Sequence, residues 1–184
     1  MTNRSAILDQ LATLALSQKT VAATPAWVMP SAKAGERVAK LVFPLAVDGV
    51  VFNGLTLELV VPLCRQNEFE NLRALLFAHV AGKRWHLGRI EFAPCCPPHR
   101  NEMWAPPGLP PMIQGDEAHA HLFADNCVCP KGEAAFSPTS DLPVARKIKT
   151  SHSHHEICSL IEQHYLIDGF WFEEDIPWER ALPF

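Results

Sequence analysis

The chain has 184 residues, 48% of them hydrophobic, and a formal net charge of −4 at pH 7. Its length and hydrophobic content allow a substantial core, and we expect a single domain over residues 1–184. The slight acidic excess argues against nucleic acid as the main partner. No apolar run approaches the roughly 18 residues that cross a membrane, and the amino-terminal stretch lacks the apolar core of a signal peptide, so we expect a cytoplasmic protein with no membrane partner.

Apolar spacing and turn residues predict the elements of the first half of the chain. Leucine and isoleucine recur on one face of residues 3–18, which predicts an amphipathic helix. From residue 38 to residue 92, apolar segments alternate with turn-forming pairs such as Asp48-Gly49 and Asn53-Gly54. These pairs supply the positive φ values that tight hairpins need, so the pattern predicts an antiparallel meander of about four strands. Pro44 cannot donate to a ladder, and we expect an edge or a bulge there.

Prolines and a helix cap define the rest of the predicted fold. Seven prolines between Pro94 and Pro111 exclude a helix or a central strand and predict an extended strap over the surface. Ser153 and Glu156 form a capping box ahead of a helix expected over about residues 153–166. The predicted fold class is therefore α+β, with an N-terminal helix, a meander of about four strands, a proline-rich strap and a C-terminal helix.

The stretch Ala118–Cys129, AHAHLFADNCVC, concentrates residues that can carry chemistry. In a strand, His119 and His121 lie on one face because successive side chains alternate. Cys127 and Cys129 follow after a polar turn. The chain has six cysteines and no secretory signal, so we expect reduced thiols rather than a disulfide framework. This arrangement can serve as a metal site, a redox pair or a cysteine nucleophile.

A zinc site is the main rival to a nucleophile. Several residues in this part of the chain are zinc-competent donors, namely Cys95, Cys96, His99, His119, His121, Cys127 and Cys129. None of their spacings is the common Cys-x-x-Cys pair, so we predict no metal site and keep a zinc-stabilised protein-binding module as the alternative function. A redox pair is disfavoured because the positions of Cys127 and Cys129 in a strand suit disulfide geometry poorly.

A cysteine nucleophile needs an accessible thiol and a hydrogen-bond donor close to the developing oxyanion. The turn-prone Ala124-Asp125-Asn126 separates the two histidines from Cys129, so the chain can fold back and bring an imidazole to the thiol. The sequence therefore favours Cys129 as the nucleophile and leaves Cys127 open as a substitute.

The order of these elements resembles the ubiquitin-conjugating enzyme family. In that family a His-Pro-Asn tripeptide stands ten residues before the catalytic cysteine, and His119-Ala120-His121 stands ten residues before Cys129. Pro106-Pro107-Gly108-Leu109-Pro110-Pro111 is similar to the family's Tyr-Pro-x-x-Pro-Pro strap, and Phe136-Ser137-Pro138 is similar to its Trp-Ser-Pro. Ala120 in place of the proline and His121 in place of the asparagine depart from the pattern, and Cys127 adds a second thiol.

The resemblance implies a divergent conjugating enzyme of a bacterial-type system. Cys129 would accept the C-terminus of a ubiquitin-like modifier protein as a thioester from an activating enzyme. His121 would hold or stabilise the oxyanion, and His119 would be structural. Asp125 or Asn126 would orient or desolvate an attacking amine. No cofactor is implied, because the thioester arrives already activated.

Overall fold

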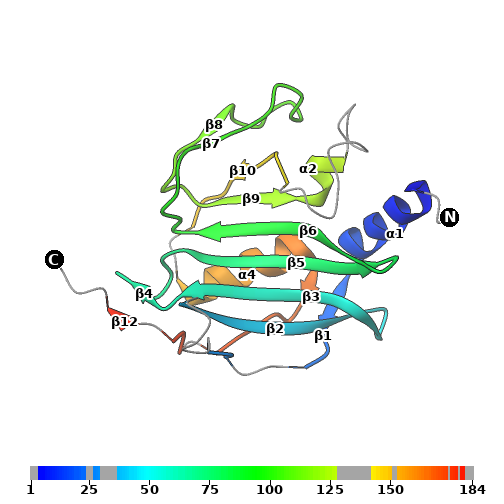
Figure 1. Ribbon diagram of the computed structural model, residues 1–184, viewed down its shortest axis with the longest axis horizontal. Coiled ribbons are helices and arrows are strands. Elements are labelled where there is room, and N and C mark those ends of the chain that lie inside the picture. Colours follow the sequence, from blue (N-terminus) through cyan, green and yellow to red (C-terminus); the bar gives the residue numbers. More distant parts are fainter. Residues whose placement is uncertain are drawn as a thin grey trace.

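A mixed sheet of eight strands organises the molecule. The computed structural model describes residues 4–23, 27–29, 37–127, 142–150, 153–173, 175–177 and 179–180 (Figure 1). The strand order in the main sheet is β10-β9-β6-β5-β3-β2-β1-β11. The strands are β1 (Lys19–Val21), β2 (Val38–Val47), β3 (Val50–Pro62), β5 (Leu72–Val80), β6 (Lys83–Phe92), β9 (His119–Leu122), β10 (Arg146–Lys147) and β11 (Ile167–Asp168). β1 and β11 run parallel, and the other neighbouring pairs are antiparallel.

Two short ladders and the helices lie around this sheet. β4 (Cys64–Arg65) pairs in parallel with β12 (Glu179–Arg180), and β7 (His99–Arg100) pairs antiparallel with β8 (Met112–Ile113). The described helices are α1 (Arg4–Leu16), α2 (Phe123–Cys127) and α4 (His154–Tyr165). In Figure 1, α4 lies behind the sheet, and the strap that contains β7 and β8 lies beyond β9. None of the described helices has the length and apolar character needed to span a membrane.

The predicted fold class is wrong in the size and topology of the sheet. We expected a sheet of about four strands, as in the ubiquitin-conjugating family, but the main sheet has eight strands and includes a parallel pair. β2, β3, β5 and β6 form an antiparallel meander at its centre, and shorter strands extend it on both sides. The added strands span only three, four, two and two residues. Such short strands carry too little alternation to be recognised in a sequence.

Local signals in the sequence do mark features of the structure. The Ser153 side chain accepts a hydrogen bond from the Glu156 N–H at 3.3 Å, and α4 begins at the next residue. The helix ends at Tyr165, before the expected stop, because Leu166 adopts a left-handed conformation with φ 55°. The β2–β3 ladder shifts register between Pro44 and Ala46, and this irregularity agrees with the missing N–H of proline.

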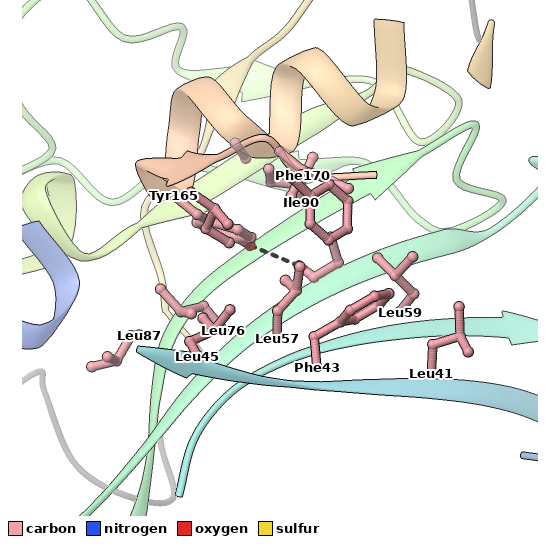
Figure 2. Close-up of a cluster of buried hydrophobic side chains, with 14 of the residues drawn as sticks. Leu41, Phe43, Leu45, Leu57, Leu59, Leu76, Leu87, Ile90, Tyr165 and Phe170 are labelled. Carbon is pink, nitrogen blue, oxygen red and sulfur yellow. Dashed lines mark hydrogen bonds between the residues drawn. The ribbon is translucent and has the colours of Figure 1, made fainter. Parts of the chain in front are cut away.

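The hydrophobic core lies between α4 and the sheet. Figure 2 shows side chains of β2, β3, β5 and β6 pointing towards the end of α4 and the segment after it. The labelled core residues are Leu41, Phe43, Leu45, Leu57, Leu59, Leu76, Leu87, Ile90, Tyr165 and Phe170. The Tyr165 hydroxyl is buried with them and donates to the Ala74 carbonyl at 2.7 Å. This bond satisfies the one polar atom that the ring brings into the core.

A buried lysine joins α1 to α4. The Lys19 ammonium donates to the carbonyls of Ala15 at 2.9 Å, Ser17 at 2.7 Å and Tyr165 at 2.9 Å. Ala15 and Tyr165 lie in the last turns of the two helices, where carbonyl groups lack helical partners. The positive charge also complements the negative ends of both helix dipoles. Lys19 therefore fixes the C-terminal ends of α1 and α4 to the start of β1.

Candidate functional site

Two of the residues predicted to carry chemistry, His119 and His121, lie on β9, the second strand from one end of the main sheet. β9 pairs with β6, and His119 and His121 stand opposite Glu91 and Arg89 in that register. Successive strand residues alternate between faces, so these four side chains point away from the face on which α4 packs. His99 of the strap lies over them, with its ring centroid 4.7 Å from that of His121 and 6.0 Å from that of His119.

His121 has hydrogen-bond partners at both ring nitrogens. Nδ1 lies 2.6 Å from the Leu142 carbonyl oxygen, and Nε2 lies 2.9 Å from Nη2 of Arg89. The carbonyl can only accept and the guanidinium can only donate, so the ring is the neutral tautomer with its proton on Nδ1. Burial, followed by the charge of Arg89, lowers the pKa of His121 to about 2. His121 is therefore a neutral link between β6 and Leu142.

His119 lies between two acceptors. Nδ1 is 2.8 Å from the Glu117 carbonyl oxygen, and Nε2 is 3.1 Å from Oε2 of Glu91. Oε1 of Glu91 lies 3.3 Å from Nε of Arg89. Burial acts to raise the pKa of Glu91, but the hydrogen bond from His119 and the charge of Arg89 outweigh it, so the pKa is lowered. An ionised Glu91 thus orients both His119 and Arg89.

Two asparagines bind the backbone of the consecutive residues Val144 and Ala145. Asn126 of α2 accepts from the Val144 N–H at 2.9 Å and donates to the Val144 carbonyl at 3.0 Å. Asn101 of the strap accepts from the Ala145 N–H at 2.7 Å and donates to the Ala145 carbonyl at 2.8 Å. The side-chain amide of asparagine carries an N–H donor and a carbonyl acceptor, as a peptide group does. Each asparagine therefore pairs with both the N–H and the carbonyl of its partner residue, as a neighbouring strand would.

These bonds extend along residues 142–148, which we call the stem segment. The Leu142 carbonyl is bound by His121, and the Pro143 carbonyl interacts with His99. The Ile148 N–H donates to the Ala118 carbonyl at 3.0 Å. Together with the two asparagine bridges, these contacts hold the stem segment against the β9 edge. We call His99, Asn101, His121 and Asn126, the side chains that bind its backbone, the polar clamp.

Two ion pairs add to the same attachment. Arg146 donates to Asp125 through Nε at 2.7 Å and through Nη2 at 2.5 Å, which is a two-bond pairing of guanidinium and carboxylate. Lys147 pairs with Glu117 at the surface. The hydrogen bond to Asp125 is the main cause that raises the pKa of Arg146. α2 and the stem segment are thus joined by both Asn126 and Asp125.

The structure brings some predicted site residues together and leaves others apart. His119, His121, Asp125 and Asn126 are all buried, and all have partners within the fold. Cys129, the predicted nucleophile, lies outside the described residues. It belongs to residues 128–141, which follow Cys127 and precede Leu142 in the sequence.

The cysteines that the structure describes do not gather into a metal site. Cys95 and Cys96 are exposed in the strap, and Cys127 is half-buried at the end of α2. Burial is the main cause that raises the pKa of the Cys96 and Cys127 thiols. Within the described part of the chain, no three histidine, cysteine or carboxylate side chains lie in an arrangement that could hold a metal ion.

Three residues of this site were not predicted from the sequence. Arg89 and Glu91 alternate in the strand sequence RIEF in the same way as the two histidines of β9, and this signal could have suggested a polar face. Asn101 stands among prolines and carries no such pattern.

No family model, curated protein or solved structure matches the chain.

Proposed function

We propose that the chain carries a ubiquitin-like modifier protein as a thioester on Cys129 and passes it to an amine. The observation that carries this proposal is the pair of hydrogen bonds between Asn126 and Val144. They join Asn126, which precedes residues 128–141 in the sequence, to Val144, which follows them. The described residues on the two sides of Cys129 in the sequence are therefore bonded to each other.

The proposed chemistry is an exchange of acyl groups. The Cys129 thiolate attacks the thioester carbonyl of the modifier on its activating enzyme, and the thiolate of that enzyme leaves. An amine then attacks the new thioester, an amide bond forms, the Cys129 thiolate leaves, and the amine loses a proton to water. No oxidation, metal or cofactor takes part, because the acyl group arrives activated.

In this proposal His121, Asn126 and Asp125 support the fold and take no direct part in the chemistry. Both ring nitrogens of His121 are hydrogen-bonded, and its low pKa keeps it from taking up a proton near neutral pH. The Asn126 amide donates to the Leu122 and Val144 carbonyls. Asp125 is engaged by Arg146. In this proposal the three residues hold the protein around Cys129, and the modifier and activating enzyme are the partners.

Site-resolved thiol labelling tests the proposal. The wild-type protein is treated with limiting iodoacetamide at pH 7, and each cysteine is followed by mass spectrometry. We expect Cys129 to react roughly tenfold faster than the exposed Cys64 because a nucleophilic cysteine is activated as a thiolate. Cys127→Ser should leave that rate unchanged. Equal rates for Cys129 and Cys64 would contradict the proposal.

Metal content separates the proposal from the zinc-stabilised module. One zinc ion per chain, together with labelling of Cys129 only after a chelator is added, would replace the enzyme by the binding module. If Cys129 labels rapidly, Cys129→Ser is the next variant, because a serine ester with the modifier resists exchange and can be isolated.

A further inference from the structure

We propose that a cavity at one end of the main sheet binds a saccharide through the polar side chains that line it. The volume of the cavity is about 420 Å³, within the range of about 300–1,000 Å³ that is typical of small-ligand sites. This site goes beyond the proposed function, because it lies at Arg84 of β6, whereas β9 pairs with Gly88–Glu91 of that strand. The lining residues are Asn53, Gly54, Thr56, Glu58, His79 and Arg84.

β3 bulges next to this cavity. Between the pairs Ala46–Val51 and Pro44–Thr56, β2 advances by two residues and β3 advances by five, so β3 holds three extra residues there. Asn53-Gly54 belongs to this bulge. Bulges interrupt pairing and re-aim side chains, and they occur often beside functional sites. The Asn-Gly pair that the sequence marks as a turn therefore forms a widened part of a strand that lines a cavity.

Gly54 allows the bulge to approach β5. Its φ is 86°, a left-handed backbone that favours glycine, and an added Cβ atom would lie 2.4 Å from Cβ of His79. The β3–β5 ladder ends at Thr56 and Phe77, and His79 lies beyond it on β5. Figure 1 shows the β2–β3 and β5–β6 turns on the same side of the sheet, where these residues meet. A side chain at position 54 would push the two walls of the cavity apart.

An ion pair forms a fixed side of the cavity. Nη2 of Arg84 donates to Oε1 of Glu58 at 2.5 Å, and the Glu58 side chain is only 16% exposed. The Arg84 guanidinium also lies over the Phe77 ring, with Cζ 3.6 Å from the ring centroid. Both charged groups are therefore held in place before a ligand arrives, which lowers the entropic cost of binding.

Three further polar side chains line the cavity: the Asn53 amide, the Thr56 hydroxyl and the His79 imidazole. Among the residues that the structure describes, none of these side chains has a hydrogen-bond partner. An amide, a hydroxyl and an imidazole each carry both donor and acceptor capacity. The cavity thus presents donors and acceptors that a ligand can use.

The charges and the hydrogen-bonding groups together select a neutral ligand with several hydroxyl groups. Glu58 and Arg84 compensate each other, so an anion would be repelled by the carboxylate and a cation by the guanidinium. A saccharide hydroxyl both donates and accepts, so adjacent hydroxyls can donate to Glu58 and accept from Arg84 at the same time. Asn53, Thr56 and His79 can bind the remaining hydroxyls. A saccharide therefore matches this lining better than a charged ligand does.

An NMR titration tests the site with glucose, mannose, galactose and maltose as probes. We expect at least one of them to shift the amide signals of Gly54 and His79 in a saturable way. Thr56→Val and Asn53→Ala each remove one hydrogen-bonding group, so each should weaken that binding roughly fivefold. The matched control is Asn67→Ala, because Asn67 lies in an exposed loop, where it accepts from the Phe69 N–H, and its loss should leave the affinity unchanged.

Each outcome supports or overturns the proposal. If none of the four saccharides gives saturable shifts at Gly54 and His79, the proposal is overturned. Inorganic phosphate that shifts these signals more strongly than any saccharide would replace the saccharide site by an anion site. Binding that both Thr56→Val and Asn53→Ala leave unchanged would place the saccharide elsewhere on the protein and overturn the assignment. Unshifted α4 amides show that each variant is folded, and the test is independent of the Cys129 labelling rate.

Discussion

Tyr165 of α4 occupies the space that Gly88 leaves open on β6. A Cβ atom added at Gly88 would lie 2.6 Å from Cε1 of Tyr165, closer than carbon atoms can approach. The ring is held at its far end by the hydrogen bond from its hydroxyl to the Ala74 carbonyl. Gly88 stands opposite Leu122 of β9, the strand that also carries His119 and His121 of the candidate site.

Gly88→Ala should destabilise the fold by about 1 to 3 kcal/mol, because the new methyl group overpacks a fixed ring. The free energy of unfolding from urea titration measures the effect. Tyr165→Leu removes the ring atoms that the methyl group would meet, so the two substitutions should be strongly non-additive. Additive losses in the double variant would show that Gly88 does not accommodate Tyr165.

The sequence predicts α1, α4 and the central strands because these elements are long and patterned, whereas the five-residue helix α2 stands where a turn was expected. The capping box of Ser153 and Glu156 and the turn at Asp48-Gly49 depend on neighbouring residues, so they can be recognised without the fold. The pairing of β1 with β11 depends on residues far apart in the chain, and neither strand is long enough to show a period. The size of the sheet therefore could not be predicted.

The candidate site was predicted only where its residues form a local pattern. The alternation of His119 and His121 indicates a shared face, and the structure places both opposite charged residues of β6. The role of Asn126 could not be predicted, because its partner Val144 comes much later in the chain. A polar residue in a turn-prone stretch gives the same sequence signal whether it faces water or binds a buried backbone.

Lys19 should make the stability of the protein rise at alkaline pH. Burial lowers the pKa of Lys19 to about 8, whereas a lysine in the unfolded chain has a pKa near 10.5. Between these values the unfolded chain binds more protons, so this group raises the free energy of unfolding by up to about 1.4 kcal/mol per pH unit. Its contribution is complete above pH 10.5 and is lost as the pH falls through 8.

The matched variant is Lys19→Met, which cannot titrate. Urea titrations of both proteins at several values from pH 7 to pH 10.5 isolate the contribution of Lys19, because other groups titrate in both. The difference in unfolding free energy should move in favour of the wild type as the pH rises. A constant difference over this range would contradict the lowered pKa.

His121 should make the protein sensitive to acid. Its pKa is lowered from 6.5 to about 2 in the folded state, so below pH 6.5 the unfolded chain takes up a proton that the folded chain excludes. The contribution of His121 is present above pH 6.5 and is lost progressively as the pH falls towards 2. The slope is at most about 1.4 kcal/mol per pH unit.

His121→Asn is the control for this prediction, because an asparagine amide can still donate to the Leu142 carbonyl and does not titrate. The wild type should lose stability relative to this variant as the pH falls below 6.5, as measured by urea titration. Nitrogen NMR shifts should also show His121 as a neutral ring at mildly acidic pH. A protonated ring under those conditions in the folded protein would contradict the assigned tautomer.

The neighbouring residues Arg146 and Lys147 offer a comparison of a buried and an exposed ion pair on one short strand. The Asp125 side chain is only 8% exposed and holds Arg146 through two hydrogen bonds, whereas Lys147 and Glu117 meet at the surface. Arg146→Met leaves a buried carboxylate without its partner and should cost about 1 to 3 kcal/mol, a range that allows for the partly exposed guanidinium.

Lys147→Met is the matched control, and its unfolding free energy should stay close to that of the wild type because water and salt already screen the surface pair. Arg146→Lys separates charge from geometry: a lysine keeps the charge but cannot form the two-bond pairing, so its stability should lie between those of the wild type and Arg146→Met. Equal losses for Arg146→Met and Lys147→Met would show that Asp125 does not hold α2 to the stem segment. A full recovery in Arg146→Lys would assign the effect to charge alone, with the planar geometry of the guanidinium contributing nothing.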